Sequence, residues 1–307
     1  MKKLILVAAI TATTAGAANA ATIYEGNGLT YELGGDFQVQ LRKAVGDDVD
    51  TDIEFDDLEV HNTVTYDLGD DMQAFGALDF SFDGAAEGDE DGAELENAFL
   101  GMQFGNVAVS VGKQDMAVEG FGIENQYENE EDQSQFAEDA GDNVVRVDFE
   151  GENLYVGAST VLEGDEDEAK GFDILAATSV ADVELALAYQ TYDNDDDLDY
   201  KAWGVSAAFD AGFAAFGADY SSADDKIADE TNKTYGLVAV VPVAETTEVS
   251  VGYQSTDYES AEDVAEWYAN VTYKFPTQKN VSVFAEIADS DADDKDLGYL
   301  AGMRVKF

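Results

Sequence analysis

The sequence predicts an all-β protein, a 16-stranded antiparallel β-barrel that crosses a membrane. Three observations predict it. Apolar and polar residues alternate along most of the chain, in segments of about 9 to 11 residues, the length of a tilted membrane strand. The connections between these segments are alternately short turns and long acid-rich loops, which is typical of an outer-membrane barrel. An export signal precedes the first segment.

The first twenty residues have the pattern of a secretory signal peptide. Lys2 and Lys3 precede the apolar run Leu4 to Ile10, and the small residues that follow lead to a cleavage site at Ala20. We expect cleavage there, so that residues 1–20 are the signal and residues 21–307 form one barrel domain. The apolar run is too short for a membrane helix, which needs about 20 apolar residues. No later run has that length, so the exported chain is either soluble or crosses a membrane as strands.

The composition is strongly acidic, with 67 acidic against 15 basic residues and a formal net charge of −52. Such a chain repels nucleic acid, whose binding depends on Lys and Arg. Repulsion among these negative charges is costly at low salt but is screened within about 3 Å at 1 M salt. We therefore expect a halophilic or marine source. Disorder is disfavoured because 45% of the residues are hydrophobic and 11% aromatic. There is no cysteine, so stability must come from strand pairing and packing.

The first strands show the alternation most clearly. Between Leu29 and Lys43, one face carries Tyr31, Leu33, Gly35, Phe37, Val39 and Leu41, and the other carries Asp36, Gln38, Gln40 and Arg42. The same pattern occurs in 58–68 and 72–82. Thirteen further segments complete the barrel: 95–104, 107–114, 143–150, 153–162, 170–179, 182–192, 200–209, 212–221, 233–242, 246–255, 265–275, 280–289 and 298–307. In 95–104 and 153–162 the pattern does not show which face is apolar.

The last strand, 298–307, is apolar on the face that carries Phe307 and mostly small or basic on the other, with Arg304 and Lys306. Because a barrel in lipid leaves no edge unpaired, we expect this strand to pair with the first, residues 29–43.

The connections separate the two rims of the predicted barrel. Tight turns are expected at 105–106, 151–152, 180–181 and 210–211. The longer connections, 44–52, 83–94, 115–142, 162–170, 193–199, 222–232, 256–264 and 290–297, hold most of the acidic residues. Aromatic residues gather near strand ends, as in the girdles of a membrane barrel. A soluble sandwich with this many strands would need two domains, and no linker divides the chain.

Two internal motifs resemble the general Gram-negative outer-membrane porins. Ala98-Phe-Leu-Gly-Met-Gln-Phe-Gly-Asn-Val-Ala-Val-Ser-Val-Gly-Lys-Gln114 is similar to a family strand pair joined by a tight turn, and Asn143-Val-Val-Arg-Val-Asp-Phe149 is similar to the strand after the family's constriction loop. The resemblance implies a homotrimer in the outer membrane, surrounded by lipid and lipopolysaccharide, with a pore in each subunit narrowed by an inward-folded third loop. It also implies that Phe307 belongs to the signal recognised by the outer-membrane assembly machinery.

The resemblance places the pore constriction at loop 115–142. The family has an acidic segment there, which Val118-Glu-Gly-Phe-Gly122 matches in part, without the family's proline. Glu119 and Glu124 are therefore candidates for the loop side of the constriction. The alternative is that these acids only solvate an exposed loop, which is what we expect of 128–132.

On the opposite wall the family carries a ladder of basic residues. Lys113 and Arg146 stand at two of its positions, and Arg42 faces the lumen by alternation but has no firm counterpart. Asp36 and His61 stand where basic residues are usual. A weakened basic ladder opposite an acidic loop predicts a preference for cations.

We expect no catalysis and no cofactor. His61 is the only histidine and has no nucleophile motif or second ligand, and no phosphate loop, HExxH or GxSxG occurs. The acidic runs 193–197 and 289–294 lack the EF-hand pattern, so only weak, shared binding of Ca²⁺ or Mg²⁺ is expected.

The sequence therefore predicts a cation-preferring channel for passive diffusion of ions and small hydrophilic solutes. Two alternatives stay open: a substrate-selective channel, and a structural or adhesive barrel whose acidic loops bind divalent cations.

Overall fold

The computed structural model describes residues 20–46, 49–88, 92–127, 134–136, 139–162, 170–194, 198–226, 230–293 and 295–307. Residues 1–19 of the predicted signal, the acidic run 128–132 and parts of the runs 193–197 and 289–294 lie outside this description.

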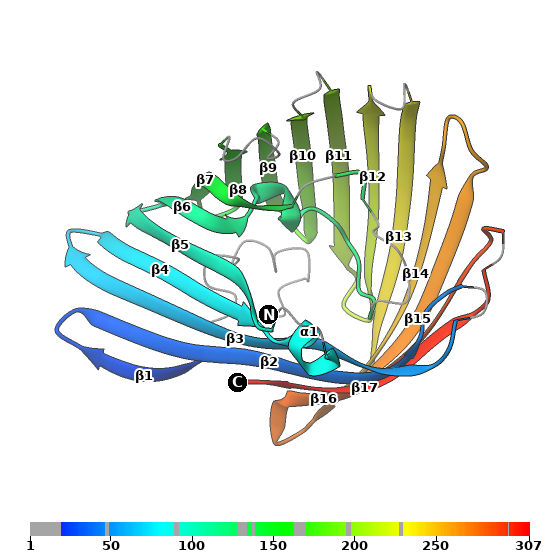
Figure 1. Ribbon diagram of the computed structural model, residues 1–307, viewed down its shortest axis with the longest axis horizontal. Helices are drawn as coiled ribbons and strands as arrows, with labels where there is room; N and C mark the ends of the chain where they lie inside the picture. Colours follow the sequence, from blue (N-terminus) through cyan, green and yellow to red (C-terminus); the bar gives the residue numbers. More distant parts are fainter. Residues whose placement is uncertain are drawn as a thin grey trace.

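Sixteen antiparallel strands, β2 to β17, form a closed ring (Figure 1). Each strand pairs with the next along the chain, and β17 pairs with β2 to complete the ring. The strands are β1 (Ala21–Gly26), β2 (Leu29–Lys43), β3 (Asp52–Gly69), β4 (Met72–Ser81), β5 (Glu94–Phe104), β6 (Val107–Asp115), β7 (Ala140–Glu150), β8 (Leu154–Val161), β9 (Lys170–Val180), β10 (Val183–Asn194), β11 (Leu198–Asp210), β12 (Ala215–Asp225), β13 (Glu230–Ala244), β14 (Thr247–Asp257), β15 (Val264–Phe275), β16 (Gln278–Ser290) and β17 (Gly298–Lys306).

Two short helices interrupt the loops in the described part of the chain. They are α1 (Asp83–Glu87) and the 3-10 helix η3 (Ala117–Gly120). No helix among the described residues is long and apolar enough to cross a membrane.

The apolar face of the strands points outward. In β2, Phe37, Val39 and Leu41 are 40%, 40% and 46% exposed, whereas Gln38 and Gln40 between them are 1% and 2% exposed. A surface that is apolar outside and polar inside is suited to lipid around it and water within it. The predicted 16-stranded barrel is confirmed.

A β-bulge explains one of the two strands that alternation left ambiguous, 95–104, whereas the other, 153–162, pairs without a bulge as β8. Along β5, Leu95 and Leu100 are both exposed although their positions differ by five, an odd number that would place them on opposite faces of a regular strand. The pairing with β4 shifts between Asp79 and Phe80, so that Glu96 is the extra residue on β5. An extra residue reverses the alternation, and sequence periodicity does not reveal where this happens.

Several strand boundaries differ from the predicted ones. β1 was not predicted; it pairs with β2 through a tight turn at Asn27 and Gly28, whose φ angles of 53° and 80° are typical of a hairpin. β3 begins at Asp52 rather than 58, and β13 begins at Glu230 rather than 233, whereas β12 begins at Ala215 rather than 212. β3 continues beyond an irregularity in its pairing with β2 at Asp57, whose φ is 49°, and this irregularity interrupts the alternation before residue 58. The residues added to β13, 230–232, are polar.

The predicted pairing between the last and first strands is confirmed. β17 pairs with residues 36–43 of β2, and β1 pairs with 29–33 on the same edge, so β1 continues the line of β17. Phe307 lies at this junction. Its backbone exchanges two hydrogen bonds with Gly35, at 3.0 and 2.9 Å, and its ring contacts Phe37 at 5.1 Å between centroids.

Candidate functional site

The loop between β6 and β7, residues 116–139 instead of the predicted 115–142, folds in its described part into the ring instead of away from it (Figure 1). We call it the constriction loop. Its first residues, Met116, Ala117 and Val118, are at most 2% exposed. They pack against inward side chains of the wall: Val144, Tyr155, Val161, Leu175, Ala186 and Ala188. The predicted inward fold is confirmed for the described part of this loop.

Two residues of the wall hold the backbone of the loop near its start. Ser159 of β8 accepts a hydrogen bond from the backbone N–H of Ala117 at 2.8 Å, and Asp173 of β9 accepts one from that of Val118 at 2.6 Å. The Ser159 hydroxyl in turn donates to the Asp173 carboxylate. We call Ser159 and Asp173 the near anchor.

Arg146 also holds the start of the loop. Its guanidinium donates hydrogen bonds to the backbone carbonyls of Asp115 and Met116, at 3.1 and 3.3 Å. It pairs with Asp148 at 3.0 Å and donates to the Tyr155 hydroxyl at 2.9 Å. Arg146 therefore faces inward and is buried beneath the start of the loop, and its charge is taken up by these partners.

The middle of the constriction loop packs against glycines of the wall. A Cβ atom at Gly204 of β11 would lie 2.5 Å from the ring of Phe121, and one at Gly217 of β12 would lie 3.0 Å from Cβ of Ile123. These distances are shorter than van der Waals contact, so a larger residue at either position would displace the loop.

The far part of the described loop is held on the other side of the barrel. The backbone N–H of Asn125 donates to the Tyr268 hydroxyl at 3.0 Å, and that of Tyr127 donates to the Glu286 carboxylate at 2.7 Å. The ring of Tyr127 stacks on Phe284 with 4.1 Å between centroids. We call Tyr268 and Glu286 the far anchor. The loop thus extends along the inner wall from β8 to β16.

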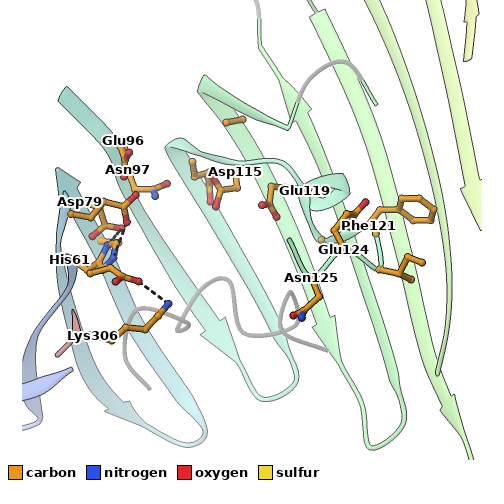
Figure 2. Close-up of a pocket in the computed structure, with 18 of the residues that line it drawn as sticks. His61, Asp79, Glu96, Asn97, Asp115, Glu119, Phe121, Glu124, Asn125 and Lys306 are labelled. Atoms are coloured by element: carbon orange, nitrogen blue, oxygen red, sulfur yellow. Dashed lines mark ion pairs between the residues drawn. The ribbon is translucent and has the colours of Figure 1, made fainter. Parts of the chain in front are cut away.

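The constriction loop and the wall line a cavity of about 920 Å³, the constriction cavity (Figure 2). Carboxylates approach it from both sides. The loop, with the end of β6 that leads into it, contributes Asp115, Glu119 and Glu124. The rest of the wall contributes Asp36, Glu59, Asp79, Glu94 and Glu96 together with His61, Lys113, Arg146, Arg304 and Lys306.

The basic side chains of the cavity wall are paired with acids. Lys306 lies 2.7 Å from Asp36, and Arg304 donates to the same carboxylate at 2.6 Å and also contacts Asp57. Lys113 pairs with Asp142. These ion pairs, like that of Arg146, cancel most of the positive charge along the wall.

His61 lies between two carboxylates of the wall. Its Nε2 is 3.2 Å from Glu59, and its Nδ1 is 3.7 Å from Asp79 (Figure 2). No group of three or more potential metal ligands was found in the described part of the chain.

The loop carboxylates have a different environment. Among the described residues, Glu119 and Glu124 form no ion pair. Burial raises the pKa of Glu124 to about 7, in spite of backbone hydrogen bonds that lower it. Glu119 projects into the open lumen, yet the surrounding protein desolvates it, and with the charges of Asp115 and Asp139 this raises its pKa above the usual range.

Six of the seven residues predicted for the constriction and lumen line the cavity: Glu119, Glu124, Lys113, Arg146, Asp36 and His61. Arg42 does not. It lies six residues from Asp36 along β2, about 20 Å at the rise of a strand, and pairs with Glu54 at 3.2 Å. The alternation of apolar and polar residues correctly predicted that Arg42 faces inward, but it did not predict its position along the barrel axis.

Sequence reasoning did not assign Arg304, Lys306 or Glu96 to the constriction. The alternation along the closing strand showed that Arg304 and Lys306 face inward, but it did not show that they lie beside Asp36. Glu96 lies at a bulge, for which the sequence carries no signal.

Comparisons with known proteins agree with this architecture. A model of the Gram-negative porin family matches residues 6–295. Porin-like protein H of Photobacterium profundum is 27% identical over 337 residues, covering 100% of both chains. The trimer form of in-vitro folded OmpT, an outer membrane protein of Vibrio cholerae, has a TM-score of 0.77 at 16% identity, covering 92% of this chain and 100% of that one.

The anion-selective porin from Comamonas acidovorans is also similar, with a TM-score of 0.72 at 15% identity, covering 91% of this chain and 100% of that one. At such identities the structural likenesses show the fold. The family match covers nearly the whole chain, and the closed barrel, apolar outside and polar inside, agrees with it. The chain therefore belongs to the Gram-negative porins and is a protein of the outer membrane.

Proposed function

We propose that the barrel is a water-filled, cation-preferring channel for passive diffusion of ions and small hydrophilic solutes, and that it catalyses no reaction. A 16-stranded barrel is wide enough to leave an aqueous lumen. The constriction loop narrows that lumen, so the groups around the constriction cavity determine which solutes pass.

One observation carries the preference for cations. Each basic side chain that lines the cavity is paired with an acid, whereas Glu96, Glu119 and Glu124 have no ion pair among the described residues. The cavity is therefore left with excess negative charge, which concentrates cations and repels anions. The net charge of −52 for the whole chain acts in the same direction.

The fold alone does not decide the preference, since a porin of similar fold is named anion-selective. The proposal depends on the side chains of the constriction cavity. The trimer form of OmpT supports a homotrimer for this chain as well. We further propose that lipid and lipopolysaccharide surround the trimer, and that assembly requires the outer-membrane assembly machinery.

The test is the reversal potential of purified trimers in planar bilayers under a KCl gradient. We expect a cation-to-anion permeability ratio above one. At about pH 9, above the pKa of Glu124, Glu119→Gln and Glu124→Gln should each lower it about two-fold, a typical size for the loss of one nearby charge. Glu152→Gln, in the exposed turn between β7 and β8, is the matched control and should leave the ratio unchanged.

Two results would contradict the proposal. A wild-type preference for anions would refute the cation preference. A complete absence of current from correctly assembled trimers would instead favour the structural or adhesive barrel.

A further inference from the structure

Asp173 is a fully buried carboxylate, 0% exposed, on the inner face of β9. It accepts hydrogen bonds from the backbone N–H groups of Val118 and Ser159, at 2.6 and 2.9 Å, and from the Ser159 hydroxyl. Among the described residues it forms no ion pair. A buried carboxylate without an ion pair is costly, and the hydrogen bonds to its oxygens, together with the charge of Arg146, offset this cost.

The bond from Val118 connects Asp173 to the charged part of the constriction loop. Glu119 is the next residue, so any shift of the Val118 backbone moves the Glu119 carboxylate within the lumen. Ser159 holds the preceding residue, Ala117, at 2.8 Å. The near anchor therefore fixes two successive backbone groups immediately before Glu119.

We propose that Asp173 and Ser159 are positioning residues that set the cation preference of the channel by holding Glu119 at its place in the constriction cavity. This inference rests on the proposed function. Asp173 is shielded from the lumen by the loop itself and does not line the cavity. It therefore acts on permeating ions through Glu119.

Other contacts of the constriction loop keep it inside the barrel, so the effect of the near anchor on Glu119 can be measured without loss of the fold. The far anchor holds Asn125 and Tyr127 independently, and Met116 and Val118 stay packed against the wall. Loss of the near anchor should therefore leave the loop inside the barrel but let Glu119 move. Contacts this close typically show coupling energies equivalent to about two-fold or more in a measured ratio.

The first experiment compares Ser159→Ala with Ser206→Ala in assembled trimers. Both serines are buried and face inward, but the Ser206 hydroxyl has no hydrogen-bond partner among the described residues. We expect Ser159→Ala to lower the permeability ratio about two-fold and to increase open-channel current noise, and Ser206→Ala to change neither. Equal behaviour of the two variants would overturn the proposal.

The second experiment is a double-mutant cycle of Asp173→Asn and Glu119→Gln. If Asp173 acts through Glu119, then Asp173→Asn lowers the ratio in the wild type but has no further effect in the Glu119→Gln background. Additive effects would show that Asp173 acts by its own charge, and would overturn the positioning role. If Asp173→Asn does not assemble, Ser159→Ala in both backgrounds provides the same cycle.

A third measurement separates failure of the anchor from failure of the proposed function. Because the chain has no cysteine, Glu119→Cys provides a single thiol. Its labelling rate with a charged thiol reagent should change when Ser159→Ala is added and stay constant with Ser206→Ala. This readout reports the loop position whether or not Glu119 controls selectivity, and an unchanged rate would refute the anchor.

Discussion

The two loop glutamates differ in their contacts although they face the same cavity. Glu119 projects from η3 into the open lumen, whereas Glu124 is half-buried between the loop and the wall. Burial favours the protonated form of a carboxyl group. This is why the pKa of Glu124 rises to about 7 from an ordinary value of 4.5.

The pKa of Glu124 predicts a pH-dependent selectivity. Below about pH 7 the group is protonated and adds no charge to the cavity, and above it the group is negative. The cation-to-anion permeability ratio should therefore rise as pH increases through 7, measured by reversal potentials from about pH 5 to about pH 9. Glu124→Gln should flatten this rise.

The pKa of Glu119 is also raised, so Glu119 contributes to the same pH dependence. Part of the rise of the permeability ratio with pH should therefore persist in Glu124→Gln, and Glu119→Gln serves as the comparison. Glu124 also makes the stability of the loop packed against the wall depend on pH, and this stability falls as pH rises, whereas the cation preference increases. Because the folded-state pKa lies above the usual one, the docked loop is most stable below about pH 4.5 and loses that contribution as pH rises to about 7. A ratio independent of pH in the wild type would contradict the assigned environment of Glu124.

At the scale of elements, alternation predicted the barrel because lipid outside and water inside impose one rule on every strand. The pairing of β17 with β2 was predicted because a barrel in lipid leaves no edge unpaired. Alternation did not predict the bulge at Glu96, because an extra residue leaves no trace in composition. It also could not identify Ser159 and Asp173, which look like any other inward polar residues until the loop folds against them.

The closing strand carries a prediction about assembly. Removing Phe307 deletes two backbone hydrogen bonds to Gly35 and the ring contact with Phe37. We expect this deletion to reduce the yield of trimers several-fold, because it weakens the edge at which the ring closes. The yield is measured by gel mobility of unheated samples.

Phe275→Ala, which removes an outward aromatic from the end of β15, is the control and should assemble. Trimers that do form without Phe307 should conduct like the wild type, since Phe307 does not line the constriction cavity. A normal yield without Phe307 would refute its role in assembly.

At the scale of the whole molecule, the net charge of −52 is the dominant property. Repulsion among exposed carboxylates is long-ranged at low ionic strength and is screened within about 3 Å at 1 M salt. We therefore expect the temperature at which trimers dissociate to rise with NaCl concentration, as followed by gel mobility after heating. A dissociation temperature independent of salt would contradict this adaptation.

MgCl₂ offers a matched comparison for the acidic loops. If divalent ions act only by screening, the NaCl and MgCl₂ curves coincide when plotted against ionic strength. The weak, shared binding expected from the sequence instead shifts the MgCl₂ curve to lower ionic strength.

The central claim is that paired basic residues and unpaired loop glutamates make the constriction cavity select cations. The most direct test is the sign of the reversal potential for wild-type trimers in an about tenfold KCl gradient at neutral pH. We predict the sign that corresponds to preferred passage of K⁺, with the preference increasing as the salt concentration is lowered. A reversal potential of the opposite sign, showing preferred passage of Cl⁻, would contradict it.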